Sequence, residues 1–275
     1  MPELPEVQTI VNDLNAADLV GHTILRAGVY WPRTIANQSP QAFCRQLEGQ
    51  TINAIGRRAK LILFELTDGW LLAVHLRMTG RFELGAAAQS PQKHMHVQME
   101  LDDGRALQYF DTRKFGRFTL VADPRSMLES FGPEPLSAAF TAKVLARQLM
   151  GRHRQIKPLL LDQSVIAGLG NIYVDEALWA ARIHPERSAN HLESDEIKAL
   201  HKAIRQVLKE GLRHNGTTLG HGQSNFYSLN QSRGRNEHHL KVFRRTGQPC
   251  PECGRPIVRI IVGQRSTHVC RHCQR

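Results

Sequence analysis

The chain has 275 residues, enough for two domains that each bury a core, and 41% of its residues are hydrophobic, as in an ordinary globular protein. Its 36 Lys and Arg against 25 Asp and Glu give a net charge of +11, and residues 233–275 alone hold ten Lys and Arg against two Glu. Such a basic segment favours a nucleic acid over a membrane surface as partner, because each neutralised phosphate releases counterions. No apolar run is long enough for a membrane helix and no signal peptide is recognisable, so a cytoplasmic protein is expected.

The predicted elements begin with a helix directly after the opening segment MPELPEV. Four apolar residues at helical spacing form one stripe: Val7, Ile10, Val11 and Leu14. Pro5 suits the first turn of this helix, and Gly21 suits its end. Pro2 has two interpretations: it is a stiff start for the helix or, once Met1 has been removed, a secondary amine that acts as a reagent.

From Thr23 to about Val121 the sequence pattern changes to that of strands. The segment KLILFELTDGWLLAVHL predicts two strands around a turn at residues 67–69. The segment HVQMELDDGRALQYF repeats this design around Asp103 and Gly104. Several strands in series with short turns indicate a sandwich or a barrel.

A stretch rich in proline and polar residues, ADPRSMLESFGPEPLS, ends the strand region, and the pattern beyond it is helical. Periodicity predicts helices over residues 138–150, 156–167, 173–181 and 195–214. Between two of them lies GLGN, whose glycines allow close approach and whose following amides can hold a phosphate. A long polar stretch then leads to a cysteine-rich end.

Four of the five cysteines form two CxxC pairs separated by sixteen residues: Cys250 with Cys253, and Cys270 with Cys273. This spacing is typical of a four-thiolate zinc site, and it favours zinc over two disulfides or a redox pair in a cytosolic chain. Four protein ligands leave no open position on the metal, so the one Zn²⁺ is expected to be structural. Cys44 is left over and is expected to be a small buried apolar residue.

Seven features in chain order, from residue 2 to residue 273, resemble the formamidopyrimidine-DNA glycosylase family: PELPEV, RRAK, HLRMTG, DTRKFG, GPEPL, GLGN and the CxxC pairs. The resemblance implies an α+β, multidomain chain, with a β-sandwich and an N-terminal helix over residues 2–122. A linker over 123–136 would lead to a helix-two-turn-helix domain over 137–235. A zinc β-hairpin over 236–275 would complete the chain.

The resemblance also implies a bifunctional base-excision repair enzyme, which removes oxidised purines such as 8-oxoguanine and formamidopyrimidines and then cleaves the strand as a lyase. With Met1 cleaved, Pro2 presents a secondary amine, a useful fraction of which is expected to be neutral at physiological pH. This amine can attack C1′ of the damaged nucleotide, giving an iminium ion that permits β- and δ-elimination. Glu3 matches the acid/base residue of the family, Lys60 its catalytic lysine, and Arg265 its phosphate-gripping arginine.

Extraction of a base leaves a void in the stack that protein side chains fill. Met78, Arg113 and Phe115 match the void-filling trio of the family. His94, Arg152 and Asn171 fall where members of the family contact the DNA backbone. The expected partner is damaged double-stranded DNA, with no membrane partner, and the protein is expected to be a monomer that associates with the nucleoid of a bacterium when it is on DNA.

The segment HGQSNFYSLNQSRGRNEHHLKVFRRTGQPC resembles the family only loosely before TGQPC. It corresponds to the loop that closes over the flipped base in the family. An endonuclease VIII-like glycosylase for oxidised pyrimidines therefore stays open as an alternative. A non-catalytic zinc protein that binds DNA is a second alternative, of a different class.

Overall fold

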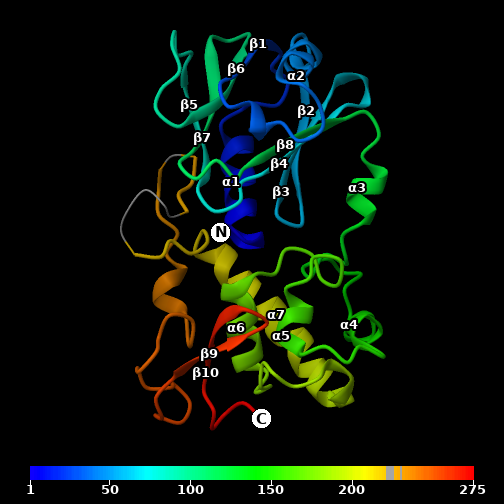
Figure 1. The fold of residues 1–275 in the computed structure, drawn as a ribbon, viewed down its shortest axis with the longest axis vertical. Coiled ribbons are helices and arrows are strands. Elements are labelled where there is room, and N and C mark those ends of the chain that lie inside the picture. Colours follow the sequence, from blue (N-terminus) through cyan, green and yellow to red (C-terminus); the bar gives the residue numbers. More distant parts are fainter. Residues whose placement is uncertain (221–225, 230) are drawn as a thin grey trace. The chain divides into compact units, whose positions relative to one another are not determined.

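A computed structural model describes residues 1–220, 226–229 and 231–275 of the chain (Figure 1). The described chain forms two compact units. The first contains residues 1–128 and 214–235, and the second contains residues 129–213 and 236–275. Among the described residues, no helix is long and apolar enough to cross a bilayer.

The described part of the first unit contains two four-stranded antiparallel sheets. One sheet has the strand order β1 (Ile24–Val29), β6 (Met95–Leu101), β7 (Arg105–Asp111) and β5 (Gly80–Ala86). The other has the order β2 (Ile52–Arg58), β3 (Leu61–Leu66), β4 (Leu71–His75) and β8 (Arg117–Val121). Both predicted hairpins are thus present, as β3 with β4 and β6 with β7.

Helix α1 (Leu4–Ala16) packs against β2 and β3, and all four residues of its predicted apolar stripe are buried. They join side chains from both sheets in one hydrophobic core, to which Phe226 and Leu229 also contribute. The helix ends at Ala16, before Gly21, which instead has a φ of +93° in the turn that leads to β1. The prediction of a β-sandwich preceded by a helix is confirmed.

Two differences from the predicted elements have local causes. No helix is predicted at α2 (Pro40–Leu47), where the Ser39 side chain accepts the N–H of Ala42 at 3.2 Å and so caps the first turn. Helix α5 (Ile156–Leu160) is predicted to continue to residue 167. It ends early because Asp162 Oδ1 accepts the N–H and the hydroxyl of Ser164, which favours a turn over a helix.

The second unit is mainly helical, with α4 (Ala142–Leu149), α5, α6 (Asn171–Ala180) and α7 (Ser194–Arg213). A short helix, α3 (Arg125–Glu129), lies in the expected linker. Short 3-10 turns are found in this unit at η3 (Ala189–His191) and η4 (Asn236–His239), and in the first unit at η1 (Pro32–Thr34) and η2 (Thr67–Gly69). Strands β9 (Val258–Val262) and β10 (Arg265–Val269) form the predicted hairpin between the two CxxC pairs.

Candidate functional site

Pro2 and Glu3 lie at the start of α1. Glu3 is the N-cap residue of the helix and is 2% exposed, and Pro2 before it is also buried. Glu6 fastens this turn, because its Oε2 accepts the N–H of Glu3 at 2.8 Å and its Oε1 accepts the N–H of Thr217 at 2.8 Å. Glu3 is a buried acidic residue directly after Pro2 in the chain, at the position that the sequence predicts for acid/base chemistry.

Lys60 lies in the tight turn between β2 and β3 and is only 5% exposed. Ala59 before it has a φ of 52°, and its carbonyl oxygen accepts a hydrogen bond from Arg57 Nη1 at 2.7 Å. Arg57 Nε donates to Gln8 Oε1 of α1 at 3.0 Å. The turn that carries Lys60 is thus tied to the helix that begins beside Glu3.

His75 is a residue near this turn that the sequence does not single out. It ends β4 opposite Leu61, and its Nδ1 accepts the N–H of Arg77 at 3.0 Å. Desolvation, followed by the positive charges of Arg77 and Lys60, lowers the pKa of His75 to about 3, so the imidazole is neutral at physiological pH. In the sequence, only its place in HLRMTG could have marked His75 as a site residue. That signal is weak, because histidine at a strand end is common.

The predicted void-filling trio is assembled within the first unit. Arg113 Nη1 donates to Met78 Sδ at 2.9 Å, and the Arg113 guanidinium lies 4.9 Å from the centroid of the Phe115 ring. Met78 is 40% exposed and Phe115 is 46% exposed, which is unusual for large apolar side chains. An exposed thioether and an exposed ring that flank a guanidinium are suited to replace a base in a stack.

His94 lies immediately before β6 and has a φ of 68°. Its carbonyl oxygen accepts the N–H of Asp111 at 3.0 Å, which joins the His94 turn to the end of β7, just before the loop that carries Arg113 and Phe115. The backbone of His94 is therefore linked to the base of the loop that carries two members of the trio.

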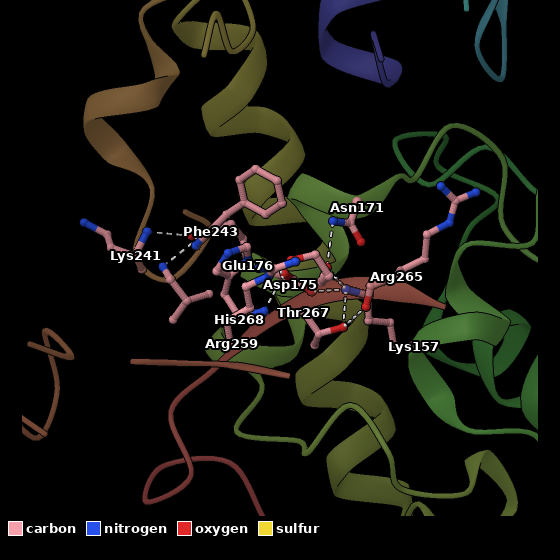
Figure 2. A network of polar contacts seen from close by, with 12 residues as sticks. Lys157, Asn171, Asp175, Glu176, Lys241, Phe243, Arg259, Arg265, Thr267 and His268 are labelled. Atoms are coloured by element: carbon pink, nitrogen blue, oxygen red, sulfur yellow. Dashed lines mark hydrogen bonds and ion pairs between the residues drawn. The ribbon is translucent and has the colours of Figure 1, made fainter. Parts of the chain in front are cut away.

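Asn171 and Arg265 belong to the second unit, where a buried polar network connects them (Figure 2). Asn171 is the first residue of α6, and its Nδ2 donates to the carbonyl oxygen of Ser266 at 2.9 Å. Ser266 follows Arg265, which begins β10 beside the hairpin turn and is exposed, with its side chain extending away from the network in Figure 2.

At the centre of the network the Lys157 ammonium forms a fully buried ion pair with Asp175 at 2.6 Å. The same ammonium donates to Ser266 O at 3.0 Å and to Thr267 Oγ1 at 2.8 Å. Asp175 Oδ2 accepts the N–H of His268 at 2.9 Å. Lys157 and Asp175 thereby fasten β10 to α5 and α6, and neither residue is predicted from the sequence.

Arg152 is exposed in the turn between α4 and α5. Among its basic neighbours, Arg154 forms an ion pair with Asp162 at 3.1 Å. The exposed position of Arg152 is compatible with a contact to a DNA phosphate.

The four predicted zinc ligands converge at the base of the β9–β10 hairpin. Their sulfur atoms all lie within 4.8 Å of one another, with 3.8 Å between Cys250 and Cys273 and 3.5 Å between Cys253 and Cys270. A tetrahedron with Zn–S bonds of about 2.3 Å has sulfur atoms about 3.8 Å apart, so the cluster fits one Zn²⁺.

The groups around Cys250 favour the thiolate form of its side chain. Burial raises its pKa, but hydrogen bonds from the Trp179 indole N–H and from the backbone amides of Cys253 and Glu252 outweigh this effect and lower the pKa of Cys250 to about 6. The thiolate is the form that binds zinc. The chain thus holds one structural zinc site, as predicted.

The sequence-predicted residues fall into two groups. Pro2, Glu3, Lys60, Met78, His94, Arg113 and Phe115 belong to the first unit, whereas Arg152, Asn171, Arg265 and the four zinc ligands belong to the second. The predicted base-capping loop includes residues 221–225 and 230, which lie outside the described residues.

Comparisons with known proteins cover nearly the whole chain. The family model of the formamidopyrimidine-DNA glycosylase N-terminal domain matches residues 1–118, that of its H2TH domain matches residues 131–222, and that of a zinc finger found in FPG and IleRS matches residues 247–275. Proteins named formamidopyrimidine-DNA glycosylase from Protochlamydia amoebophila and from a Roseiflexus species are 46% and 49% identical, over the full length of both chains in each case.

Solved structures of the Lactococcus lactis protein are also similar. A complex of one of its single-residue variants with a Fapy-dG containing DNA has a TM-score of 0.90 and 37% identity, and covers 99% of both chains. A complex with DNA that contains an abasic site has a TM-score of 0.89 and 36% identity, with the same coverage.

Proposed function

Because the chain belongs to the formamidopyrimidine-DNA glycosylase family, we propose that it excises oxidised purines from double-stranded DNA and then cleaves the strand as an abasic-site lyase. The similar Lactococcus lactis protein is seen with Fapy-dG containing DNA and with abasic-site DNA, the substrate and the intermediate of these two steps. The proposal rests on a buried acidic residue, Glu3, that directly follows Pro2 at the start of α1.

The reaction begins once Met1 has been removed, because only then is the Pro2 nitrogen an amine. The nitrogen lone pair bonds to C1′ of the damaged nucleotide, the glycosidic bond breaks and the base leaves with a proton. The Glu3 carboxyl group supplies that proton or protonates the sugar oxygen, and afterwards shuttles protons.

Loss of the amine proton and protonation of the ring oxygen O4′ then break the C1′–O4′ bond and leave an iminium ion between Pro2 and C1′. This ion draws electrons and acidifies the hydrogens at C2′. Loss of a C2′ proton expels the 3′ phosphate by β-elimination, and a second elimination expels the 5′ phosphate. Lys60 and Arg265 stabilise the negative charge on the base and on the phosphates. The buried position of Lys60 favours this role, because a charge acts more strongly where water is excluded.

Borohydride reduction tests the proposal directly, since it converts the iminium ion into a stable bond between protein and DNA. We expect the wild-type protein to become covalently attached to a duplex that contains 8-oxoguanine. The variant Pro2→Gly is expected to lose most strand cleavage and trapping, while its salt-sensitive binding to DNA stays largely intact. Pro40→Ala, which changes a proline in the first turn of α2, is the matched control.

A protein that binds DNA without catalysis would give no covalent product, and equal loss of binding and cleavage in Pro2→Gly would contradict the role of Pro2. A panel of duplexes with defined lesions decides between oxidised purines and the oxidised pyrimidines of the endonuclease VIII-like alternative. Faster excision of oxidised pyrimidines would overturn the substrate assignment. Action as a cytoplasmic monomer on nucleoid DNA is part of the same proposal.

A further inference from the structure

We propose that Asp111 is the positioning residue that holds Met78, His94, Arg113 and Phe115 in one arrangement for insertion into DNA. This inference rests on the proposed function. Asp111 ends β7 and begins the segment DTRKFG, and it is fully buried, with 0% exposure. It therefore reaches DNA only through the residues that it holds.

The Asp111 carboxylate gathers the backbone of its own loop. Oδ2 accepts the N–H of Phe115 at 2.8 Å and the N–H of Gly116 at 2.8 Å. Oδ1 accepts the N–H of Arg113 at 3.1 Å. Three backbone amides that donate to one carboxylate fix the path of the loop. They thereby fix the backbone positions from which the Arg113 and Phe115 side chains extend.

The same carboxylate reaches a second loop, the one that carries Met78. Asp111 Oδ1 accepts a hydrogen bond from the hydroxyl of Thr79, the residue after Met78. The Thr79 hydroxyl oxygen also accepts the N–H of Arg113 at 3.2 Å. Thr79 thus bridges the two loops, and the Asp111 N–H extends the arrangement to His94 through its 3.0 Å hydrogen bond to the His94 carbonyl oxygen.

Packing beneath the loops leaves little freedom for another arrangement. The Tyr109 side chain is buried under both motifs, and a Cβ at Gly80 or at Gly116 would overlap the Tyr109 hydroxyl. The motifs HLRMTG and DTRKFG therefore both end in glycine because both close on the same phenol ring. Met78 and Phe115 are therefore exposed side chains on loops that pack closely against the buried Tyr109 ring.

The charge of Asp111 is satisfied without a cation. Among the described residues it forms no ion pair with lysine or arginine, and the donors to its carboxylate are three backbone amides and one hydroxyl group. Arg113 is therefore left to contact Met78, Phe115 and a DNA base rather than the nearest carboxylate. Side chains that are already ordered before binding lose less entropy when they enter the duplex.

The test compares two DNA substrates that differ in the need for void filling. Excision of 8-oxoguanine from a duplex requires the orphaned base and the void to be accommodated, whereas borohydride trapping on single-stranded abasic DNA does not. In Asp111→Asn the amide group presents N–H donors to backbone N–H groups. We expect duplex excision to fall roughly 10- to 100-fold, while single-strand trapping stays within about twofold of the wild type.

The matched control is Asp68→Asn, which changes an exposed turn aspartate with a φ of 55° in the same unit, and it is expected to behave as the wild type on both substrates. If Asp111→Asn does not fold, the pair Thr79→Val and Thr79→Ser decides. Valine removes the hydroxyl bridge and should reproduce the loss on duplex DNA, whereas serine keeps the bridge and should restore excision.

A readout that does not depend on catalysis separates this inference from the proposed function. A duplex with an abasic analogue opposite 2-aminopurine reports the stacking of the orphaned base by its fluorescence. The wild type should change the fluorescence at saturation, and Asp111→Asn should bind with a smaller change. Equal loss on both DNA substrates, or an unchanged rate and unchanged fluorescence in Asp111→Asn, would overturn the positioning role even where wild-type trapping succeeds.

Discussion

Two buried aspartates organise the predicted DNA-contacting residues of the two units in different ways. Asp111 in the first unit accepts hydrogen bonds from three amides and a hydroxyl group. Asp175 in the second unit forms an ion pair with the buried ammonium of Lys157, with 2.6 Å between Oδ1 and Nζ, and accepts the N–H of His268. The first arrangement joins two loops through hydrogen bonds from uncharged groups, whereas the second depends on a buried ion pair between side chains of α5 and α6, so the two units should respond differently to substitution.

The largest expected effect comes from loss of the zinc site, which is in the second unit. Cys250→Ser removes one zinc ligand, and a structural zinc site contributes on the order of 10 kcal/mol to folding. Because the β9–β10 hairpin carries Arg265, we expect zinc content and DNA affinity to be lost together. Metal analysis with a binding titration measures both, and unchanged affinity in the metal-free protein would remove the structural role of zinc. Cys44→Ser, in the first unit, is the control and should keep its zinc.

The next largest effect should come from Lys157→Met, which leaves Asp175 buried without its cation. Breaking a buried ion pair from one side costs about 3–5 kcal/mol, because the remaining charge is uncompensated. We expect a corresponding loss in denaturant unfolding, with part of it recovered when Asp175→Asn is added. A double variant that is as unstable as the sum of both single variants would show that the pair is not coupled.

A smaller effect is expected in the first unit from Gly116→Ala, because the added Cβ overlaps the Tyr109 hydroxyl. Overpacking of this kind costs typically about 1–3 kcal/mol. Tyr109→Phe removes the hydroxyl, which has no hydrogen-bond partner among the described residues, and should relieve part of the cost. Denaturant unfolding of both single variants and of the double variant measures this coupling, and strictly additive losses would contradict the shared packing.

The smallest expected effect concerns acid stability and His75. Since its folded pKa of about 3 lies below the ordinary value near 6.5, the unfolded chain binds the proton more readily, and stability is lost as pH falls from about 6.5 towards 3. His75→Asn keeps an acceptor for the Arg77 N–H and does not titrate. Its unfolding free energy should fall less between pH 7 and about pH 4.5 than that of the wild type, by roughly 1 kcal/mol for a partly exposed group. An identical pH dependence in both proteins would contradict this assignment.

The sequence predicts elements whose signals are local. The apolar stripe of α1, the two hairpins and the paired cysteines each repeat a short pattern, and each is found in the structure. Helix α2 is missed although Ser39 and Pro40 form an ordinary helix start, because its eight residues are too few for the apolar pair Phe43 and Leu47 to stand out as a longer stripe. The predicted extension of α5 is wrong because Asp162 begins a turn through its own side chain.

The parts of the candidate site that the sequence does not reveal depend on long-range contacts. Glu6 with Thr217, Lys157 with Asp175, and Asp111 with Thr79 are distant in sequence and become neighbours only after folding. Each of these residues has an ordinary local interpretation, such as a first-turn glutamate or a surface lysine. Residues that would touch DNA are found by their motifs, whereas residues that hold them in place are found only from the folded chain.

The most direct test of the central claim, that the Pro2 nitrogen is the nucleophile, is peptide mass spectrometry of the borohydride-trapped protein after nuclease and protease digestion. We expect Met1 to be absent and the remnant of deoxyribose to be attached to the N-terminal peptide at Pro2. An adduct on Lys60, or active protein that retains Met1, would contradict it.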